Sequence, residues 1–262
     1  MVEDGEDRAE STGDLPSEAP QSPGRMREVY DEIAPHFSNT RAHPWPEVET
    51  FLAAVVSAGG QQSVGRRQVG LDVGCGNGRH TRLLADVVGT AVGLDLSHEL
   101  LVEARAMMAP NAGNGGNGEN EGCRGVERGG WTAELAQADA AALPVAAGTV
   151  DVALYVATIH HLPDRETRVG SLEELARVLG PGGRGLVSAW STAHDRFDAA
   201  ADAEEGFDTT LDWTLPGGET VPRFYHIYAP AEFERDLRDA GLVVDSAVVS
   251  SGNCYAEVRP GG

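Results

Sequence analysis

The stretch Leu71-Asp72-Val73-Gly74-Cys75-Gly76-Asn77-Gly78 decides the fold expected for this chain. It joins an apolar run at 69–73, which predicts a strand, to helical spacing at 81–88. Glycines in such a turn let the backbone bend sharply and let a ligand approach it closely. The third glycine of the dinucleotide-binding GxGxxG pattern would fall at Arg79, so that fingerprint is absent. A purely structural turn is the alternative at this point.

Two further acids follow the next strands predicted along the chain. Asp95 ends the strand predicted at 91–95, where an ionised carboxylate can accept hydrogen bonds from ribose hydroxyls. Asp139 precedes a Leu143-Pro144 turn and can meet an adenine edge. A single acid of this kind is more often a helix cap or a solvated residue. Three acids at successive strand ends, Asp72 included, indicate a nucleotide-like ligand.

Strand and helix patterns alternate around these acids. Further strands are predicted at 150–156 and 184–189, and further helices at 97–108 and 165–179. Asp164 is the predicted N-cap of the last helix, which Pro181-Gly182-Gly183 stops. Such alternation predicts an α/β fold, a doubly wound, mostly parallel sheet with helices on both faces. Ligands of such sheets bind beyond the carboxyl ends of the strands.

Composition limits the function classes. The chain has 262 residues, 41 acids and 20 bases, and every base is an arginine, so the net charge is −21. A basic footprint is the first sign of a simple nucleic-acid binder, and it is missing. The 41% hydrophobic content is ordinary for a folded protein, so the charge belongs to a folded surface.

The cysteines and the lack of long apolar runs indicate the cellular compartment of the protein. Cys75, Cys123 and Cys254 are far apart and form no CxxC pair, so neither a disulfide framework nor a zinc ribbon is predicted. The histidines lack metal-ligand spacing, and no metal is expected. The amino terminus is acidic, and no run of about 18 apolar residues occurs. We therefore expect a cytoplasmic protein.

The charge and the low-complexity segments predict the domain organisation. Residues 1–25, rich in Gly, Pro, Ser and acids, are predicted to be a disordered acidic tail. Residues 26–262 form a single predicted domain, with a Gly/Asn-rich insertion at 109–130 and an acidic, substrate-side segment at 191–222.

Taken together, the motifs resemble those of class I S-adenosylmethionine-dependent methyltransferases. The resemblance rests on 72–78, on Asp95, on Asp139-Ala140 and on the Leu179-Gly180-Pro181-Gly182-Gly183 turn. It implies a seven-stranded, Rossmann-like sheet and S-adenosyl-L-methionine as the cofactor, with Asp72 organising the site. The implied cofactor-binding residues are Asp72, Gly74, Cys75, Gly76, Gly78, Asp95, Leu96, Asp139, Ala140 and Val156.

Three flanking segments are more specific. Residues 30–41 with Pro44-Trp45-Pro46, residues 155–161, and residues 223–228 ahead of a helix predicted at 231–240 resemble the tRNA wobble-uridine carboxymethyl methyltransferases. The family implies a tRNA substrate and a heterodimer with a small zinc-ribbon activator subunit. The activator adds a strand to an edge of the sheet. Residues 91–94 are one apolar strand compatible with that contact.

The acceptor chemistry follows from the segment after the fourth predicted strand. Enzymes of this fold that methylate amino nitrogens carry Asn/Asp-Pro-Pro-Tyr/Phe there, whereas this chain has Ala157-Thr158-Ile159-His160-His161, which favours an oxygen or carbon acceptor. A carboxylate is already ionised at neutral pH and needs no base. Arg41 and Arg223 are then the predicted clamp. For a hydroxyl acceptor, His160 or His161 would be the base.

Aromatic and histidine residues complete the predicted site. The predicted substrate-binding residues are Tyr30, His36, Trp45, Tyr225 and His226. The histidines after the fourth strand and several of these aromatics have structural roles as their alternative. A small-molecule O- or C-methyltransferase and a non-catalytic cofactor-binding scaffold are the alternative functions.

The net negative charge of the protein should repel the phosphates of a tRNA substrate strongly only in dilute salt. The absence of lysine and the excess of acids resemble proteins of salt-loving archaea, so we expect a halophilic protein. At about 1 M salt the screening length is about 3 Å, and long-range repulsion between the protein and phosphates largely disappears. Recognition through a few arginines then remains possible.

Overall fold

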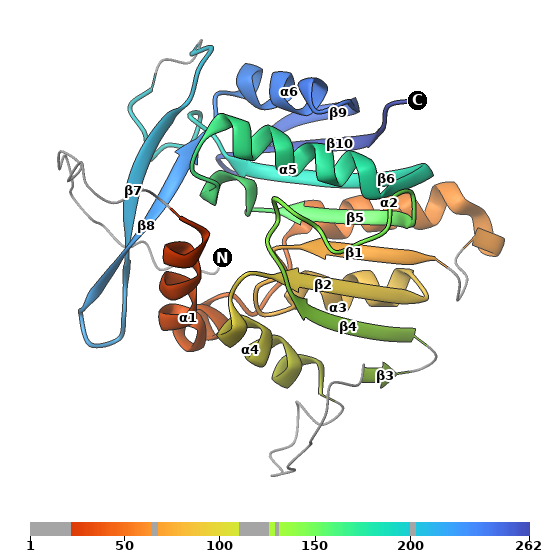
Figure 1. The fold of residues 1–262 in the computed structure, drawn as a ribbon, viewed down its shortest axis with the longest axis horizontal. Helices are drawn as coiled ribbons and strands as arrows, with labels where there is room; N and C mark the ends of the chain where they lie inside the picture. Colours follow the sequence, from red (N-terminus) through yellow and green to blue (C-terminus); the bar gives the residue numbers. More distant parts are fainter. Residues whose placement is uncertain (1–21, 64–67, 110–125, 129–130, 200–202) are drawn as a thin grey trace.

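The computed structural model describes residues 22–63, 68–109, 126–128, 131–199 and 203–262. Within these residues an eight-stranded sheet runs in the order β3-β4-β2-β1-β5-β6-β10-β9 (Figure 1). Its strands are β1 (Val69–Val73), β2 (Thr90–Asp95), β3 (Val126–Arg128), β4 (Trp131–Gln137), β5 (Val150–Val156), β6 (Leu179–Trp190), β9 (Leu242–Ser250) and β10 (Asn253–Pro260).

The middle of the sheet is parallel. β4, β2, β1, β5 and β6 run in one direction, and β10 pairs antiparallel with both β6 and β9. The α/β prediction of a mostly parallel, seven-stranded sheet is confirmed by the strands from β4 to β9. β3 adds a short eighth strand, antiparallel to β4. The carboxyl ends of the five parallel strands therefore meet at one edge, where ligands of such sheets bind.

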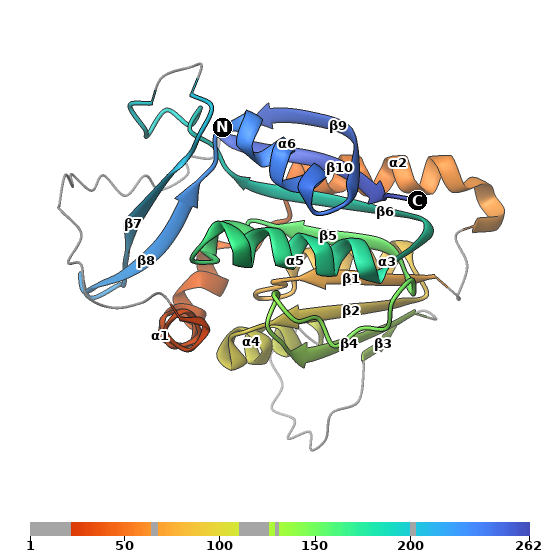
Figure 2. The same ribbon diagram turned by 45° about the horizontal axis from the view of Figure 1, so that its top comes forward.

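Helices cover both faces of the sheet (Figure 2). They are α1 (Pro23–Thr40), α2 (Pro46–Ser63), α3 (Arg79–Val87), α4 (His98–Met108), α5 (Arg165–Val178) and α6 (Pro230–Asp239), with one 3₁₀ turn, η1 (Ile159–His161). α5 and α6 bury Leu172, Leu175 and Phe233 in the core on one face. α2 and α3 bury Phe51 and Leu84 on the other. α4 packs beside α3.

The helices predicted in the motif region are confirmed to within two residues at each end. Local capping explains their starts. The Asp164 side chain accepts a hydrogen bond of 2.7 Å from the Thr167 amide at the start of α5, as predicted. Ser97 caps α4 in the same way, accepting from the Leu100 amide at 3.1 Å. These caps fix the helices directly after the strand ends that form the site.

A cap lies over the carboxyl ends of the parallel strands. It consists of α1 and the separate hairpin of β7 (Phe207–Thr214) and β8 (Thr220–Ile227), which lie together at one end of the sheet (Figures 1 and 2). Val29 and Ile33 of α1 pack against Trp213 and Val221 of the hairpin in a small buried cluster. Segments almost 200 residues apart in the sequence thus close one side of the site.

The structure refines the predicted organisation. Most of the predicted tail, 1–25, lies outside the described residues, and its last three residues belong to α1, which Ser22 caps. Most of the insertion predicted at 109–130 is also outside them, although β3 falls within it. The segment 191–222 contributes β7 and the start of β8. Proposing 91–94 as an edge strand was wrong, because β2 lies between β1 and β4.

Other sequence expectations concern what the described residues contain. Cys75 and Cys254 are buried free thiols, and Cys123 is outside the described part of the chain. None of the described helices combines the length and the apolar character needed to cross a membrane. No cluster of three or more His, Cys, Asp or Glu suited to a metal ion occurs among the described residues.

Candidate active site

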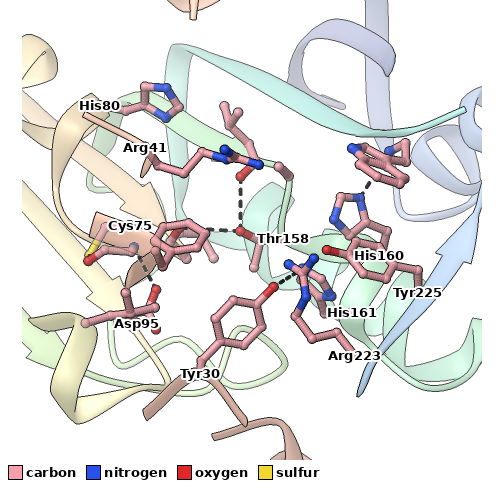
Figure 3. A pocket seen from close by; sticks show the side chains of 18 of the residues that line it. Tyr30, Arg41, Cys75, His80, Asp95, Thr158, His160, His161, Arg223 and Tyr225 are labelled. Atoms are coloured by element: carbon pink, nitrogen blue, oxygen red, sulfur yellow. Dashed lines mark hydrogen bonds between the residues drawn. The ribbon is translucent and has the colours of Figure 1, made fainter. Parts of the chain in front are cut away.

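A cavity of about 1390 Å³ lies between the strand ends and the cap. Figure 3 shows Asp95 and Cys75 at one end, Arg223, Tyr225 and His161 at the other, and Thr158 between them. The sheet end is lined by Val73, Gly74, Cys75, Gly76, Asn77, Leu94, Asp95, Leu96, Ala138, Asp139, Ala140, Leu143, Val156, Ala157 and Thr158. The cap end is lined by Tyr30, His36, Phe37, Arg41, Trp45, His160, His161, Trp190, Trp213, Arg223 and Tyr225.

The glycine-rich turn passes close to the strand ends. Gly74 and Gly76 have φ angles of 69° and 55°, in the left-handed region that favours glycine. A Cβ on Gly74 would lie 2.1 Å from the Thr158 Oγ1 atom, so no side chain fits there. The amides of Gly74 and Cys75 donate to the Leu94 carbonyl at 2.7 and 2.9 Å. The turn therefore exposes bare backbone to the cavity.

Asp95 connects the turn to the next helix. Its two oxygens accept one hydrogen bond each, from the amides of Gly76 at 2.7 Å and Ser97 at 2.8 Å. Burial raises the pKa of this carboxyl to about 6, although the backbone hydrogen bonds oppose the shift. Each oxygen of an ionised carboxylate keeps a further acceptor position. Asp95 can therefore accept two hydroxyl groups from within the cavity.

Asp72 lies behind the cavity wall and does not line it. It is buried, and the Thr81 hydroxyl of α3 donates to it at 2.6 Å. Burial raises the pKa of its carboxyl to about 7, and the hydrogen bond from Thr81 lowers it. Asp72 therefore holds the end of β1 to α3, which agrees with an organising role more than with direct contact.

Gly78 does not line the cavity, contrary to its predicted contact with the cofactor. It is the N-cap of α3, with φ 78°. A Cβ at this position would lie 2.5 Å from the Met108 Cε atom and 3.1 Å from the Ala104 Cβ atom of α4. The positive φ and the nearby Ala104 Cβ atom favour glycine here, so the structure gives this residue a reason besides the predicted cofactor contact.

The third strand-end acid closes an apolar slot. Asp139 lines the cavity, and its Oδ1 atom accepts from the Ala141 amide at 2.9 Å, which leaves its other oxygen for a ligand. The neighbouring wall is formed by Leu96, Ala140, Leu143 and Val156. Apolar side chains beside a carboxylate that can accept a hydrogen bond suit a purine ring with its amino group.

The two histidines at the cap end have no free basic nitrogen. The Nδ1 atom of His160 accepts from the Trp190 amide at 3.1 Å, so the neutral ring carries its proton on Nε2. The Nδ1 atom of His161 lies 3.0 Å from the Phe224 carbonyl, which can only accept. The Nε2 atom of His161 therefore accepts from the Tyr30 hydroxyl at 2.7 Å. Burial lowers the pKa of His161 to about 3 and that of His160 well below its ordinary value.

Arg223 is the buried cation of the cap end. Its side chain comes from β8, is 9% exposed, and lies over the rings of Trp213 at 4.7 Å and Tyr225 at 5.2 Å. Its Nε atom has no hydrogen-bond partner among the described residues. Burial lowers the pKa of Arg223, but its interactions with Tyr225 and Tyr30 outweigh this and leave the pKa raised, so the guanidinium stays charged. A buried cation without a carboxylate partner indicates an anionic ligand.

Arg41 lies between the glycine-rich turn and the hairpin. It follows α1, and its carbonyl accepts from the Asn77 side chain at 3.0 Å. Its guanidinium lies 5.4 Å from the centre of the Trp213 ring. Both predicted clamp residues therefore line one cavity and contact one tryptophan.

The remaining predicted substrate residues divide into two groups. His36, whose Nδ1 atom accepts from the Trp213 indole at 3.0 Å, and Trp45 line the cavity. His226 does not: its ring nitrogens lie 2.7 Å from Asp208 and 3.0 Å from Glu232. As successive side chains of a strand point to opposite faces, His226 faces α6 when Tyr225 faces the cavity. Its predicted substrate contact is therefore not supported.

Several lining residues were missed. Thr158 supports the glycine-rich turn, and Trp190 stacks on Tyr225 with ring centres 5.2 Å apart. Trp213 contacts both arginines. Thr158 and Trp190 sit at or just after strand ends, which was a usable signal. Trp213 lies in an acidic segment whose sequence pattern did not predict a strand, so no sequence signal pointed to it.

The doubly wound sheet, the bare glycine turn and the strand-end carboxylates define a class of enzyme that binds a nucleoside cofactor. A family model described as "Methyltransferase domain" matches residues 71–187. The chain belongs to the class I S-adenosylmethionine-dependent methyltransferases, a family whose cofactor is S-adenosylmethionine. The turn, Asp95 and the apolar slot fit the amino acid, ribose and adenine parts of this cofactor.

Relatives add detail. A tRNA (carboxymethyluridine(34)-5-O)-methyltransferase of mouse, ALKBH8, is 34% identical over 166 residues, which is 63% of this chain and 20% of that protein. The Saccharomyces cerevisiae protein of the same enzyme name is 31% identical over 200 residues, 76% of this chain and 59% of that protein. An Encephalitozoon cuniculi protein named provisionally as a methyltransferase is 31% identical over 222 residues, which is 84% of this chain and 87% of that protein. This chain thus spans a fifth of the mouse relative.

Solved structures share the fold. The DhpI complex with SAH has a TM-score of 0.59 at 18% identity, covering 91% of this chain and 97% of that chain. A Haloferax volcanii structure, solved as a complex with the Trm112 methyltransferase activator, has a TM-score of 0.59 at 17% identity, covering 90% and 98%. At these identities the likeness concerns the fold alone.

Proposed function

We propose that this methyltransferase esterifies the carboxymethyl side chain of a wobble uridine in tRNA. The observation that carries the proposal is a buried Arg223, which forms no ion pair with an acid among the described residues, beside two histidines whose ring nitrogens offer no base. A hydroxyl acceptor must lose a proton, whereas an ionised carboxylate needs none. The names of the mouse and yeast relatives support the same acceptor.

The residues around the acceptor have distinct tasks. The cofactor supplies an electrophilic methyl group on a sulfonium. Arg223, with its planar fork, binds and orients the acceptor carboxylate in a water-poor site. His160 Nε2–H is a further donor to the acceptor. Tyr30 and the Phe224 carbonyl hold the His161 ring in place. An ionised carboxylate oxygen would accept the methyl group without losing a proton, so the chain needs to bind and orient it but not to supply a base.

Mass spectrometry of tRNA nucleosides from a deletion strain tests this function. Loss of the methyl ester with accumulation of carboxymethyluridine is the expected result. Wild-type chain should restore the ester, and the Arg223→Met variant should not. An unchanged nucleoside profile would contradict the proposal and favour a small-molecule acceptor. Failure of the purified chain to bind S-adenosylmethionine would instead favour a scaffold.

We infer that the chain works as a heterodimer with a small zinc-ribbon activator that extends the sheet. β3 pairs only with Trp131–Ala133 of β4, and no described strand pairs with the outer edge of residues 134–137. Val102 of α4, which packs beside β4, is 42% exposed. Such an edge can accept a strand, and an exposed valine beside it can be covered.

Copurification with the activator tests this interface. The Val102→Asp variant should lose the activator, while Val248→Asp at the opposite edge, on β9, should retain it. Loss of the activator in Val248→Asp but not in Val102→Asp would show that the activator binds at β9 instead. A wild-type chain that stays alone when both proteins are expressed together would contradict the heterodimer.

We also infer that the protein is adapted to concentrated salt, on the basis of its 41 acids and missing lysines. Acid–acid repulsion on the folded surface weakens as salt is added. The melting temperature should therefore rise from dilute buffer to molar KCl. A melting temperature that does not change over this range would contradict the adaptation.

A further inference from the structure

Trp213 lies where the two halves of the cap meet. It is a residue of β7, is 8% exposed, and lines the cavity. Its ring packs with Val29 and Ile33 of α1 and with Val221 of β8. The sequence alone did not predict a function for Trp213, which lies within an acidic segment.

The indole ring contacts two guanidinium groups that come from different elements. Arg223 of β8 lies 4.7 Å from the ring centre, and Arg41, just after α1, lies 5.4 Å from it. Neither arginine forms an ion pair with an acid among the described residues, although acids outnumber bases two to one in this chain. The face of one aromatic ring attracts both cations, which offsets the repulsion between like charges that lie on the same side of the cavity.

The indole N–H fixes the direction of the ring. It donates to the Nδ1 atom of His36 at 3.0 Å, and the two rings meet edge to face. His36 belongs to α1, so this hydrogen bond ties the ring from the hairpin to the helix that carries Arg41 at its end. A phenylalanine ring could attract the arginines but could not make this bond.

We propose that Trp213 is a positioning residue, which holds Arg41 and Arg223 ready for the carboxylate of the acceptor. This inference rests on the proposed function. Because the two cations are ordered before the acceptor arrives, less ordering is needed on binding. Trp213 thereby makes the site selective for an anionic acceptor over a neutral one of the same shape.

The test measures binding and turnover separately in full-chain variants, each prepared together with the activator. Trp213→Leu removes the aromatic face, and Trp213→Phe keeps it but removes the donor. Val221→Ala is the matched control, since Val221 packs in the same cluster and does not line the cavity. Calorimetry in the presence of S-adenosylhomocysteine uses 5-carboxymethyluridine and its neutral amide as probes, and kinetics use tRNA that carries 5-carboxymethyluridine.

The inference predicts a specific pattern. Trp213→Leu should weaken 5-carboxymethyluridine binding about tenfold, with Trp213→Phe in between and the cofactor Kd unchanged. The KM for tRNA should rise more than kcat falls. Val221→Ala should lower the melting temperature without changing the preference for the carboxylate over the amide.

Three results would overturn the inference: unchanged binding in Trp213→Leu, equal losses for carboxylate and amide, or the same loss in Val221→Ala. No binding of the carboxylate to the wild type would overturn it together with the proposed function. Binding of 5-carboxymethyluridine without methyl transfer to tRNA would reject the proposed function alone, because the positioning role would still show in the binding series.

Discussion

The two ends of the cavity are built in opposite ways. The cofactor end consists of backbone, small residues and carboxylates from consecutive strand ends, with Gly74, Asp95 and Asp139 as its main features. The acceptor end consists of aromatic rings and arginines that α1, η1 and the β7–β8 hairpin bring together. One end offers hydrogen-bond acceptors for a ribose, and the other offers cations. The difference shows that a chain with net charge −21 can still place two arginines, Arg41 and Arg223, at one end of a cavity.

Replacing Arg223 should have the largest effect, and only at the acceptor end. Arg223→Met should lower kcat/KM for the tRNA acceptor about 100-fold or more, because removing one partner of a buried charge pair costs about 2–5 kcal/mol. Arg223→Lys should recover part of the activity, since it keeps the charge and loses the fork. Steady-state kinetics measure kcat/KM for the tRNA acceptor, and calorimetry measures the Kd of the cofactor in the same variants.

Arg82→Met, at an exposed position of α3 that does not line the cavity, is the control. It should leave both ends unchanged. A cofactor Kd that changes as much as kcat/KM in Arg223→Met would show that the two ends are not separate.

Replacing Asp95 should affect the opposite end. Asp95→Ala should weaken S-adenosylmethionine binding about 100-fold or more, because two hydrogen bonds to a charged group are worth about 1.5–3 kcal/mol each. The Gly76 amide also loses its acceptor. Calorimetry measures the Kd, and Asp95→Asn, which keeps one acceptor oxygen, should fall in between. Cofactor binding by Asp95→Ala as tight as in the wild type would contradict the assignment.

The pH dependence of cofactor binding should be smaller. Asp95 has a pKa of about 6, so its carboxylate is protonated as pH falls from 7 to 5. The cofactor affinity should fall about tenfold over this range, because a protonated carboxyl accepts fewer hydrogen bonds. Calorimetry at several pH values checks this. An affinity that is constant between these pH values would contradict the account.

Stability should change with pH in the opposite direction. Burial raises the pKa of Asp72 from 3.8 to about 7, so the folded chain holds this proton more tightly than the unfolded chain. The contribution is fully present below the ordinary value, and it is lost as pH rises through about 7. The free energy of unfolding should therefore decrease over the range in which cofactor affinity increases. Denaturation of wild type and Asp72→Asn measures the difference.

The smallest effect on the ligands should come from Gly78. Gly78→Ala should destabilise the fold by about 1–3 kcal/mol through overpacking against Ala104 as well as Met108, without changing the cofactor Kd. Gly148→Ala is the control, since Gly148 also has a positive φ, of 68°, but no atom within 4 Å of an added Cβ. Thermal unfolding of Gly78→Ala should show the larger loss. If Gly78→Ala, but not Gly148→Ala, binds the cofactor more weakly than the wild type, Gly78 contributes to the cofactor site.

The sequence was sufficient to predict that the glycine turn and the acids Asp95 and Asp139 meet at one edge of the sheet, because these features are local. The turn and the acids each follow a strand whose apolar pattern is visible in a few residues. Gly78 shows the limit, since its neighbour Met108 on α4 becomes visible only when the helices are packed. A pattern of residues cannot separate a glycine needed for a ligand from one needed for a helix.

The acceptor end depended on long-range packing. Tyr30 and His161 are separated by 131 residues, and His36 and Trp213 by 177. The family resemblance placed Arg223 and Tyr225 in the site, but it could not tell that the next residue, His226, faces α6. Histidine tautomers also depend on neighbours such as the Phe224 carbonyl, which no sequence pattern specifies.

The pH dependence of single-turnover methyl transfer to tRNA tests the central claim most directly, with cofactor and tRNA both saturating. The claim is that the acceptor end holds an ionised carboxylate and uses no base. The account predicts a rate that is constant from about pH 6 to 9, because the acceptor carboxylate is fully ionised there and His161, with a pKa of about 3, does not titrate. A rate that rises with an apparent pKa of about 6 to 7, and loses that dependence in His160→Gln or His161→Gln, would contradict it.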